Sequence, residues 1–357
     1  MKIIGTMLSR MIFFRFVAVL LGISLFVLTL EVVSFSKEIL ALDESSSSMV
    51  FRYILMRLPG TLATFLPMSF LLALLLSLTE LSYRNEVTAI WASGVSPARL
   101  IVMLVPLSLV IGVFHYVLAD RAIPVTAPTL RIWGIADYGD KRLKLGERDP
   151  IWMRSGNDIL RAGKANADST ELRDVIIFRR DEQGELVSQI MAPFAKLGTA
   201  SWELKDAVVV TQASAATTAM PILTYEGTLR PAAAGSRSGD PEEMTITDLS
   251  YFVANAGFGI RPTYVYETWW HKRLTPLFTG LLMTAICVPL ASRFRRGGGL
   301  GVLFSAGVGL GFLYFIFDGL MVSAGELGFV VPWLAAWLPV LVFGTIAASL
   351  VLRSERT

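Results

Sequence analysis

The sequence predicts a membrane protein with six transmembrane helices and a β-rich domain inserted after the third helix. Three observations support this fold class. The 357 residues are 54% hydrophobic and only 17% charged, which is too apolar for a soluble chain of this length. The apolar residues are gathered into long runs. A long polar stretch with the alternation of β-strands separates the third run from the fourth.

Six runs are long enough to cross a bilayer, since a transmembrane helix needs about 20 predominantly apolar residues. They are residues 11–35, 60–81, 98–119, 274–292, 300–322 and 331–352. The first run exceeds the roughly 7–15 apolar residues of a cleavable signal peptide, so we expect it to remain as a transmembrane helix. The expected domains are residues 1–130 with three helices, residues 131–262 with the β-rich insertion, and residues 263–357 with three more helices.

Basic residues in the short loops indicate the orientation, because Lys and Arg are enriched on the cytoplasmic side. One side holds Lys2, Arg10, Arg15, Arg84, Arg99, Arg293, Arg295, Arg296, Arg353 and Arg356. The short loops of the other side hold Lys37, Arg52 and Arg57. We therefore expect both termini inside the cell and the β-rich domain outside. The net charge of +3 comes from basic residues at the ends of apolar runs, so it does not indicate nucleic-acid binding.

The outside stretch contains several short segments that alternate as strands do. The clearest are Ile151–Arg154, Asp158–Arg161, Val175–Arg179, Leu186–Met191 and Trp202–Val210. Turn signals separate them at Ser155–Asp158 and Asp181–Gly184. This spacing favours a sandwich, a jelly roll or an open barrel. Residues 231–243 have loop composition, and Thr247–Ala256 has the pattern of a short helix leading back to the membrane.

Residues 82–95, between the second and third runs, predict a short amphipathic helix on the inner side. Its apolar face would consist of Tyr83, Val87, Ile90 and Trp91, and its polar face of Arg84, Asn85, Glu86, Thr88 and Ser93. Gly94 provides a helix stop, because glycine takes the left-handed conformation without strain. Ser96 and Pro97 have the pattern of the cap and first residue of the next helix. Two interpretations remain: a helix lying in the lipid headgroups, or a docking helix for a partner protein.

No motif for catalysis or nucleotide binding is present in the sequence. There is no G-x-x-x-x-G-K-[ST], no G-x-S-x-G and no H-E-x-x-H, and the glycine run at 297–301 follows arginines rather than a strand. The single cysteine, Cys287, excludes an intrachain disulfide and a cysteine-based zinc site. We expect no enzymatic activity, metal or cofactor in this chain.

Three ionisable residues near or inside the membrane have more than one interpretation. His115 in the third run is either a buried, hydrogen-bonded histidine or part of a proton relay. His271 has the position of an interfacial anchor. Asp318 lies deep enough in the fifth run to be the one candidate for ion-coupled transport.

Several strings stand out by their order and spacing along the chain. They are Phe65–Met68, Arg84–Glu86, Ala92–Gly94, Trp269, Pro276–Leu277, Tyr314–Asp318 and the terminal VPWLAAWLP. Together they resemble the LptF/LptG family of lipopolysaccharide export permeases. The resemblance covers essentially the whole chain and is closer to the LptG members than to the LptF members.

The resemblance implies partners and an energy source. An LptG-like permease would pair with an LptF-like permease and an LptB-like ATPase dimer, which binds ATP and magnesium. The ATPase would grip the helix at 82–95, through Arg84, Glu86, Val87, Ile90, Trp91 and Gly94. Glu86 matches an acidic family residue expected to pair with a basic group on the ATPase. We expect the apolar face to supply most of the contact, because burying it outweighs an exposed ion pair of about 0–1 kcal/mol.

The resemblance also implies the substrate and its path. Lipopolysaccharide phosphates would meet basic residues at the outer rim, with Lys37, Arg131, Lys272 and Arg273 as candidates and Arg52 and Arg57 as weaker ones. Acyl chains would meet the first and fifth helices, where a lateral gate would include Gly307, Gly311 and Asp318. Ordinary close packing also explains these glycines. The outside domain would be a periplasmic β-jellyroll that passes lipid to LptC and through it to LptA.

Other functions remain open at this point. The chain could be the LptF-like partner subunit or a permease for another envelope lipid. It could also be a non-ABC membrane assembly protein that docks other proteins through its outside domain. The family's location would be the bacterial inner membrane, with both termini cytoplasmic.

Overall fold

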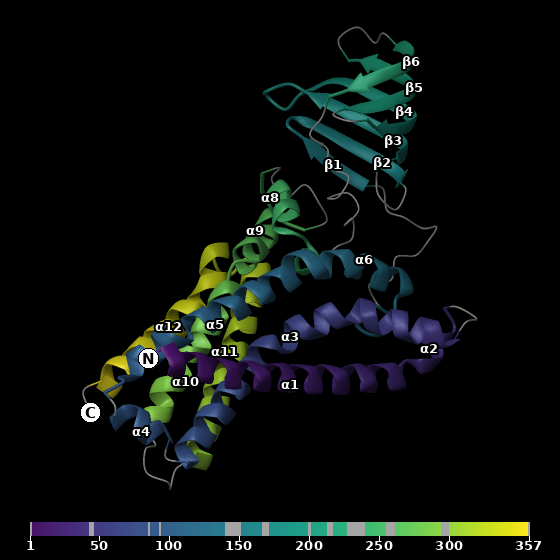
Figure 1. The fold of residues 1–357 in the computed structure, drawn as a ribbon. Coiled ribbons are helices and arrows are strands. Elements are labelled where there is room, and N and C mark those ends of the chain that lie inside the picture. Colours follow the sequence, from purple (N-terminus) through teal and green to yellow (C-terminus); the bar gives the residue numbers. More distant parts are fainter. Residues whose placement is uncertain are drawn as a thin grey trace. The chain divides into compact units, whose positions relative to one another are not determined.

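The computed structural model divides the chain into two compact units, Met1–Gly139 with Thr268–Thr357, and Asp140–Glu267 (Figure 1). The residues it describes are 2–42, 46–84, 86–92, 94–139, 151–165, 171–198, 201–212, 217–226, 240–254, 261–293 and 300–355. The first unit is helical and the second contains a β-sheet. Asn85, Ser93, Arg295, Arg296, Arg356 and the glycines at 297–299 lie outside the described residues.

Long helices build the first unit. They are α1 (Lys2–Ser34), α3 (Ser46–Tyr83), α5 (Pro97–Val117), α10 (Pro276–Arg293), α11 (Leu300–Glu326) and α12 (Pro332–Glu355). Shorter elements are α2 (Ser36–Leu40), α4 (Glu86–Ala92), the π-turn η1 (Leu118–Ala122), α6 (Ile123–Trp133) and η2 (Ala136–Tyr138). Five described helices are long and apolar enough to cross a membrane, and α9 (Thr263–Lys272) with α10, bent by 51°, makes a sixth candidate. The predicted membrane-helical fold class is confirmed.

Two helices extend far beyond the predicted apolar runs. The second was expected from residue 60, but α3 begins at Ser46, so Arg52 and Arg57 lie within a helix and the prediction that they occupy a loop is wrong. The third was expected to end near 119, but it continues through η1 and α6 to Trp133. The apolar runs missed these extensions because charged residues and prolines interrupt them, and side-chain contacts within the fold stabilise such segments as helix.

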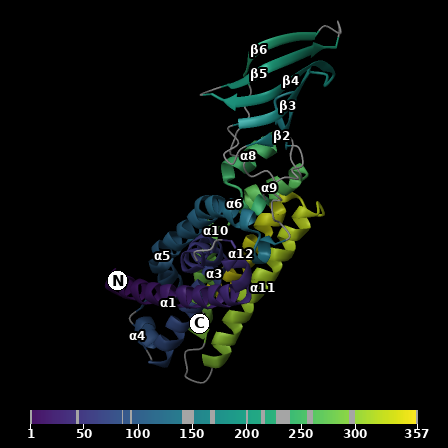
Figure 2. The same ribbon diagram turned by 90° about the vertical axis from the view of Figure 1, so that its right-hand side faces the viewer.

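The core of the helical unit surrounds α3. About 67% of the apolar window of α3 is buried, against 22% of that of α1, and α3 contacts α1, α10 and α11 (Figure 2). One stripe of α1, with residues four apart, faces this core through Leu8, Ile12, Phe16 and Leu20. Phe16 meets Phe70 of α3 edge to face at 5.8 Å. Cys287 of α10 is fully buried, so it is a core residue rather than a lipid-facing one.

The second unit contains a six-stranded antiparallel sheet in the order β1-β2-β3-β4-β5-β6. The strands are β1 (Ile151–Ser155), β2 (Asp158–Ala165), β3 (Glu171–Arg180), β4 (Leu186–Leu197), β5 (Trp202–Thr211) and β6 (Thr217–Tyr225). The five predicted strands are therefore confirmed. The sixth was missed, because Pro221 in its middle is unusual in a strand. Two short elements follow, η3 (Pro241–Glu243) and α8 (Ile246–Ala254), and α8 confirms the predicted helix.

A row of unusual residues crosses the sheet from β2 to β6. The strand registers place Gly163, Asp174, Pro193, Asp206 and Pro221 opposite one another, and no ladder pair is formed along this row. Asp174 has φ 53° and Asp206 has φ 51°. Prolines cannot donate to the ladder, and a left-handed residue kinks a strand. The row therefore creases the sheet.

At the crease, the buried side chains change from one face of each strand to the other. In a regular strand, buried residues are two apart, yet Leu172 and Val175 of β3 are both buried, as are Leu204 and Ala207 of β5. The buried residues on both sides of the crease belong to one core, which includes Trp202 at 1% exposure. A single sheet can bury its own face in this way only if it is rolled.

A side-chain contact across the roll supports this description. The hydroxyl of Tyr225, on β6, donates to Asp158 Oδ2 on β2 at 3.0 Å, although three strands separate β2 from β6 in the sheet. Burial and the neighbouring Asp158 carboxylate raise the pKa of Tyr225 above its ordinary value, so the hydroxyl keeps the proton it donates. Among the described strands, the domain is a rolled antiparallel meander without crossovers.

The crease leads to a testable expectation. Asp206→Val should cost about 1–2 kcal/mol, because a β-branched residue is strained at positive φ. Hydrogen exchange of the β4 and β5 amides in the full chain should then accelerate roughly 5–30-fold. Asp206→Gly should show no such acceleration. Glu203→Val, at an exposed position of the same strand, is the matched control, and equal exchange in both valine variants would contradict a strained crease.

Candidate functional site

The segment between α3 and α5 forms the short helix expected from the sequence. Helix α4 is flanked by the ends predicted for it: Gly94 has φ 82°, and the Ser96 hydroxyl accepts from the Arg99 backbone N–H at 3.3 Å. Glu86 and Ala89 are exposed and Ile90 is half-buried. The side chains of Val87 and Trp91 lie outside the described part of the chain. A short helix is therefore confirmed, but the predicted bounds 82–95 and the place of Tyr83 on its face are wrong, because Tyr83 is the last residue of α3. The docking role stays a prediction.

Arg84 connects this segment to the membrane helices. Its guanidinium pairs with Glu80 Oε1, one turn earlier on α3, at 2.7 Å. Glu80 Oε2 accepts from Arg15 of α1. Sequence reading placed both arginines on the inner side but missed Glu80, since an acidic residue at the end of an apolar run carries no distinct signal. The structure brings the three side chains together.

The predicted phosphate-binding residues have different surroundings. Lys37, on α2, is exposed. Arg131 of α6 is 4% exposed and Arg273 is 5% exposed. The Arg273 guanidinium donates to the carbonyl of Ala119 in η1 at 2.8 Å, where the wider π-turn leaves backbone groups to be satisfied. Buried guanidiniums are already committed to the protein, so in this conformation Lys37 is the accessible member of the set.

The fourth basic candidate pairs with a residue assigned to another role. Lys272 Nζ, at the end of α9, donates to both carboxylate oxygens of Asp318 on α11, at 2.6 Å for Oδ2. The two side chains are 18% and 16% exposed. A second contact joins the same helices, since Trp269 Nε1 donates to Glu326 Oε1 at 2.7 Å. The lysine neutralises the one deep acidic candidate for ion coupling.

A polar cluster at the other end of α1 was not anticipated. Arg57 of α3 donates through Nε to Glu31 Oε1 of α1 at 2.8 Å and also pairs with Asp137 of η2. The guanidinium carbon of Arg57 lies 5.5 Å from the centre of the Tyr138 ring, a cation–π contact. Sequence analysis considered Arg57 only as a loop residue and a weaker phosphate candidate, because only the tertiary fold makes it a neighbour of Glu31.

The small residues of α11 mediate close packing on α3. A Cβ added to Gly307 would lie 2.5 Å from Leu75, and one added to Gly311 would overlap Leu71. The expected close approach of helices is thus observed at these two glycines. A gate at this place remains a prediction.

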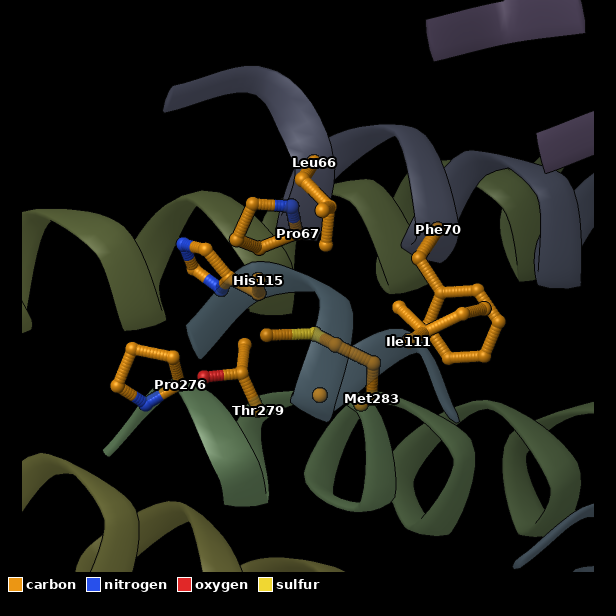
Figure 3. A pocket seen from close by; sticks show the side chains of 10 residues that line it. Leu66, Pro67, Phe70, Ile111, His115, Pro276, Thr279 and Met283 are labelled. Carbon is orange, nitrogen blue, oxygen red and sulfur yellow. The ribbon is translucent and has the colours of Figure 1, made fainter. Parts of the chain in front are cut away.

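His115 lies in a small apolar pocket between α3, α5 and α10 (Figure 3). The pocket has no room for a water molecule and is lined by residues that include Pro67, Phe70, Pro276 and Met283. Nδ1 of His115 makes no hydrogen bond to the described residues, so the expectation of a hydrogen-bonded histidine is not met at that atom. Among the ten described residues lining the pocket, His115 is the only ionisable one, which does not favour a proton relay.

Among the described residues, no group of three or more His, Cys, Asp or Glu side chains is placed to hold a metal ion. The described residues thus provide a short helix between two long membrane helices, ion pairs that join separate helices and, in the second unit, a rolled β-domain.

Comparison with known proteins agrees with that description. The family model described as lipopolysaccharide export system permease LptF/LptG matches residues 7–353. The lipopolysaccharide export system permease protein LptG of Haemophilus influenzae is 23% identical over 295 residues, covering 80% of each chain. The protein of the same name from Escherichia coli K12 is 24% identical over 314 residues, covering 85% of each chain.

Proposed function

This chain belongs to the LptF/LptG family of lipopolysaccharide export permeases, and from that premise we propose that it is the LptG-like subunit of an ABC exporter. As a family member it is a multi-pass inner membrane permease. In the proposed complex, an LptF-like permease completes the pore and an LptB-like ATPase dimer binds ATP and magnesium. Lipopolysaccharide leaves the inner membrane and passes to LptC and then to LptA.

The structure of α4 supports the proposed contact with the ATPase. Helix α4 is a separate seven-residue helix with a stop at one end and a capped helix after it, held between two long membrane helices. Its exposed Glu86 and Ala89 leave a surface open for a partner. The positive-inside distribution of Lys and Arg supports a cytoplasmic location for this helix and a periplasmic β-domain. Docking here converts nucleotide-driven closure of the ATPase into helix movement.

The basic residues support a lipid phosphate site at the outer rim. Lys37 on α2 and Arg131 on α6 belong to neighbouring elements, because Ile39 and Leu130 of the same helices pack in one apolar cluster. In this proposal Lys37 meets the phosphate first. Arg131, Lys272 and Arg273 add positive charge behind it and come into contact when the helices move.

The docking proposal is tested by co-purification. The chain is expressed with its cell's candidate ATPase and a second permease, and Trp91→Asp and Glu86→Lys are compared with wild type. Trp91→Asp should weaken ATPase binding by about 2 kcal/mol, roughly 30-fold, because aromatic anchors dominate such contacts. Glu86→Lys should have a smaller effect, since an exposed pair contributes about 0–1 kcal/mol.

A matched control is Glu38→Lys, which changes an exposed carboxylate on α2. Unchanged ATPase binding in Trp91→Asp would place the contact elsewhere. Absence of any ATPase with the wild-type chain would favour a non-ABC assembly protein instead.

A further inference from the structure

One carboxylate joins the docking segment to the first membrane helix. Glu80, near the end of α3, accepts from Arg84 with Oε1 and from Arg15 of α1 with Oε2. Each oxygen serves a guanidinium from a different part of the chain. We propose that Glu80 is a positioning residue that transmits displacement of α4 to α1. This inference rests on the proposed function, in which α4 is the docking helix.

The exposure of the three side chains decreases from Arg84 through Glu80 to Arg15. Arg84 follows directly after α3 and precedes α4 by one residue, so movement of α4 acts on it first. Its side chain is 62% exposed, against 36% for Glu80 and 27% for Arg15. The backbone N–H of Arg84 also donates to the Glu80 carbonyl at 3.0 Å. A partner that contacts α4 can therefore reach Arg84, and through it the more enclosed pair.

An open groove beside the ion pair gives α1 room to respond. The groove has a volume of about 490 Å³ and is lined by Arg15, Ala18, Val19, Leu76, Thr79, Glu80 and Tyr83. The apolar contact between α1 and α3 is the separate stripe that contains Ile12 and Phe16. Arg15 can consequently change its position without leaving a cavity in the close-packed core. Beside the groove, the Arg15–Glu80 ion pair connects α1 to α3.

Repulsion between two cations provides the mechanism. The guanidiniums of Arg84 and Arg15 share one carboxylate and repel each other, so Glu80 holds each less strongly than it would hold one alone. When docking draws Arg84 away from Glu80, this repulsion falls and α1 is held more firmly to α3. Because such coupling is reciprocal, a lipid that displaces α1 changes the affinity of α4 for the ATPase by the same factor.

A distance measurement tests this tie in the chain itself, without any partner. Cysteines introduced at the exposed positions Met7 on α1 and Ala89 on α4 carry spin labels, while the native Cys287 is fully buried. We expect a narrow distance distribution in wild type, and a broader or shifted one in Glu80→Gln and Arg15→Gln. Arg15→Lys keeps the charge and should retain the wild-type distribution. The double variant Arg15→Gln with Glu80→Gln should resemble Glu80→Gln alone, because Glu80→Gln already removes the contact with Arg15.

The control is Glu38→Gln, which neutralises an exposed carboxylate on α2 and should leave the distribution unchanged. A Glu80→Gln distribution identical to wild type overturns the proposal.

The second measurement uses the reconstituted complex with the second permease and the ATPase. Glu80→Gln should retain ATPase co-purification, while lipopolysaccharide extracted per ATP hydrolysed falls about fivefold or more. An unchanged ratio overturns the transmission role. If wild type itself fails to bind the ATPase, the proposed function fails, and the distance measurement still decides whether Glu80 ties α4 to α1.

Discussion

A Gly280→Val variant is expected to unfold at a markedly lower temperature than the unsubstituted chain, because α10 crosses α5 backbone to backbone at this residue. A Cβ on Gly280 would lie 2.6 Å from the carbonyl oxygen of Ser108, and one on Gly112 would lie 2.5 Å from that of Leu277. Both obstacles are main-chain atoms, so no side-chain rotation relieves them. Ser108 and Thr284 also share a buried hydrogen bond of 2.8 Å across the same contact.

Overpacking a close contact costs about 1–3 kcal/mol, and two helix backbones in the way place Gly280→Val near the upper end. A loss of about 3 kcal/mol corresponds to a Tm lower by roughly 6–12 °C. Thermal unfolding in detergent measures it. Gly344→Val in α12 is the control, since a Cβ there meets nothing within 4 Å. Equal Tm values for the two variants would mean that the crossing tolerates a side chain.

Asp318→Ala is expected to destabilise the helical unit by about 4 kcal/mol, because it leaves the Lys272 ammonium half-enclosed without its partner. Thermal unfolding of the purified chain measures this loss. The double variant Lys272→Met with Asp318→Leu should recover most of it, since an apolar pair needs no compensation for lost hydration. If Asp318→Ala were as stable as the double variant, the Lys272–Asp318 pair would be too exposed to affect stability.

The same substitution separates two transport mechanisms. In the proposed exporter, the stable double variant should keep ATP-dependent lipid extraction at a reduced rate, because it lacks one cation of the phosphate site while Asp318 serves only to hold α11 against α9. A proton-coupled transporter would lose transport in both variants and would not require ATP. Extraction by the double variant in proteoliposomes, with and without ATP, distinguishes these outcomes. Complete loss of ATP-dependent extraction despite a normal Tm would assign the Lys272–Asp318 pair a role beyond packing and phosphate attraction.

Prediction from sequence succeeded where short-range chemistry dominates. The apolar runs, the strands, the turn at Asp181–Gly184 and the ends of α4 at Gly94 and Ser96 all depend on residues within a few positions of one another. The predicted boundaries of α3 and of the third span were wrong, because the extensions of these helices contain charged residues whose partners lie elsewhere in the chain. Arg57, for example, finds Glu31 and Asp137 only once the helices have packed.

Sequence reading was least informative about charged residues. Lys272 and Asp318 were assigned to a phosphate site and a gate, and the structure pairs them with each other. Arg131 and Arg273 were expected at the outer rim, and both are buried in this conformation, so their contact with phosphate stays a prediction. A basic residue at a membrane-helix end has the same local pattern whether it binds a ligand, anchors at the interface or joins two helices. Its partner lies far away in the chain.

The sequence by itself determined that this protein is a polytopic membrane protein with an inserted β-domain and a capped short helix between the second and third spans, because hydrophobic periodicity and turn chemistry act locally. Only the tertiary structure decided that the sheet rolls along the row from Gly163 to Pro221, that α5 and α10 cross at two glycines, and that Glu80 holds two arginines. Each of these depends on which distant segments meet. The free energy of a contact depends on distance and burial, and spacing along the chain specifies neither.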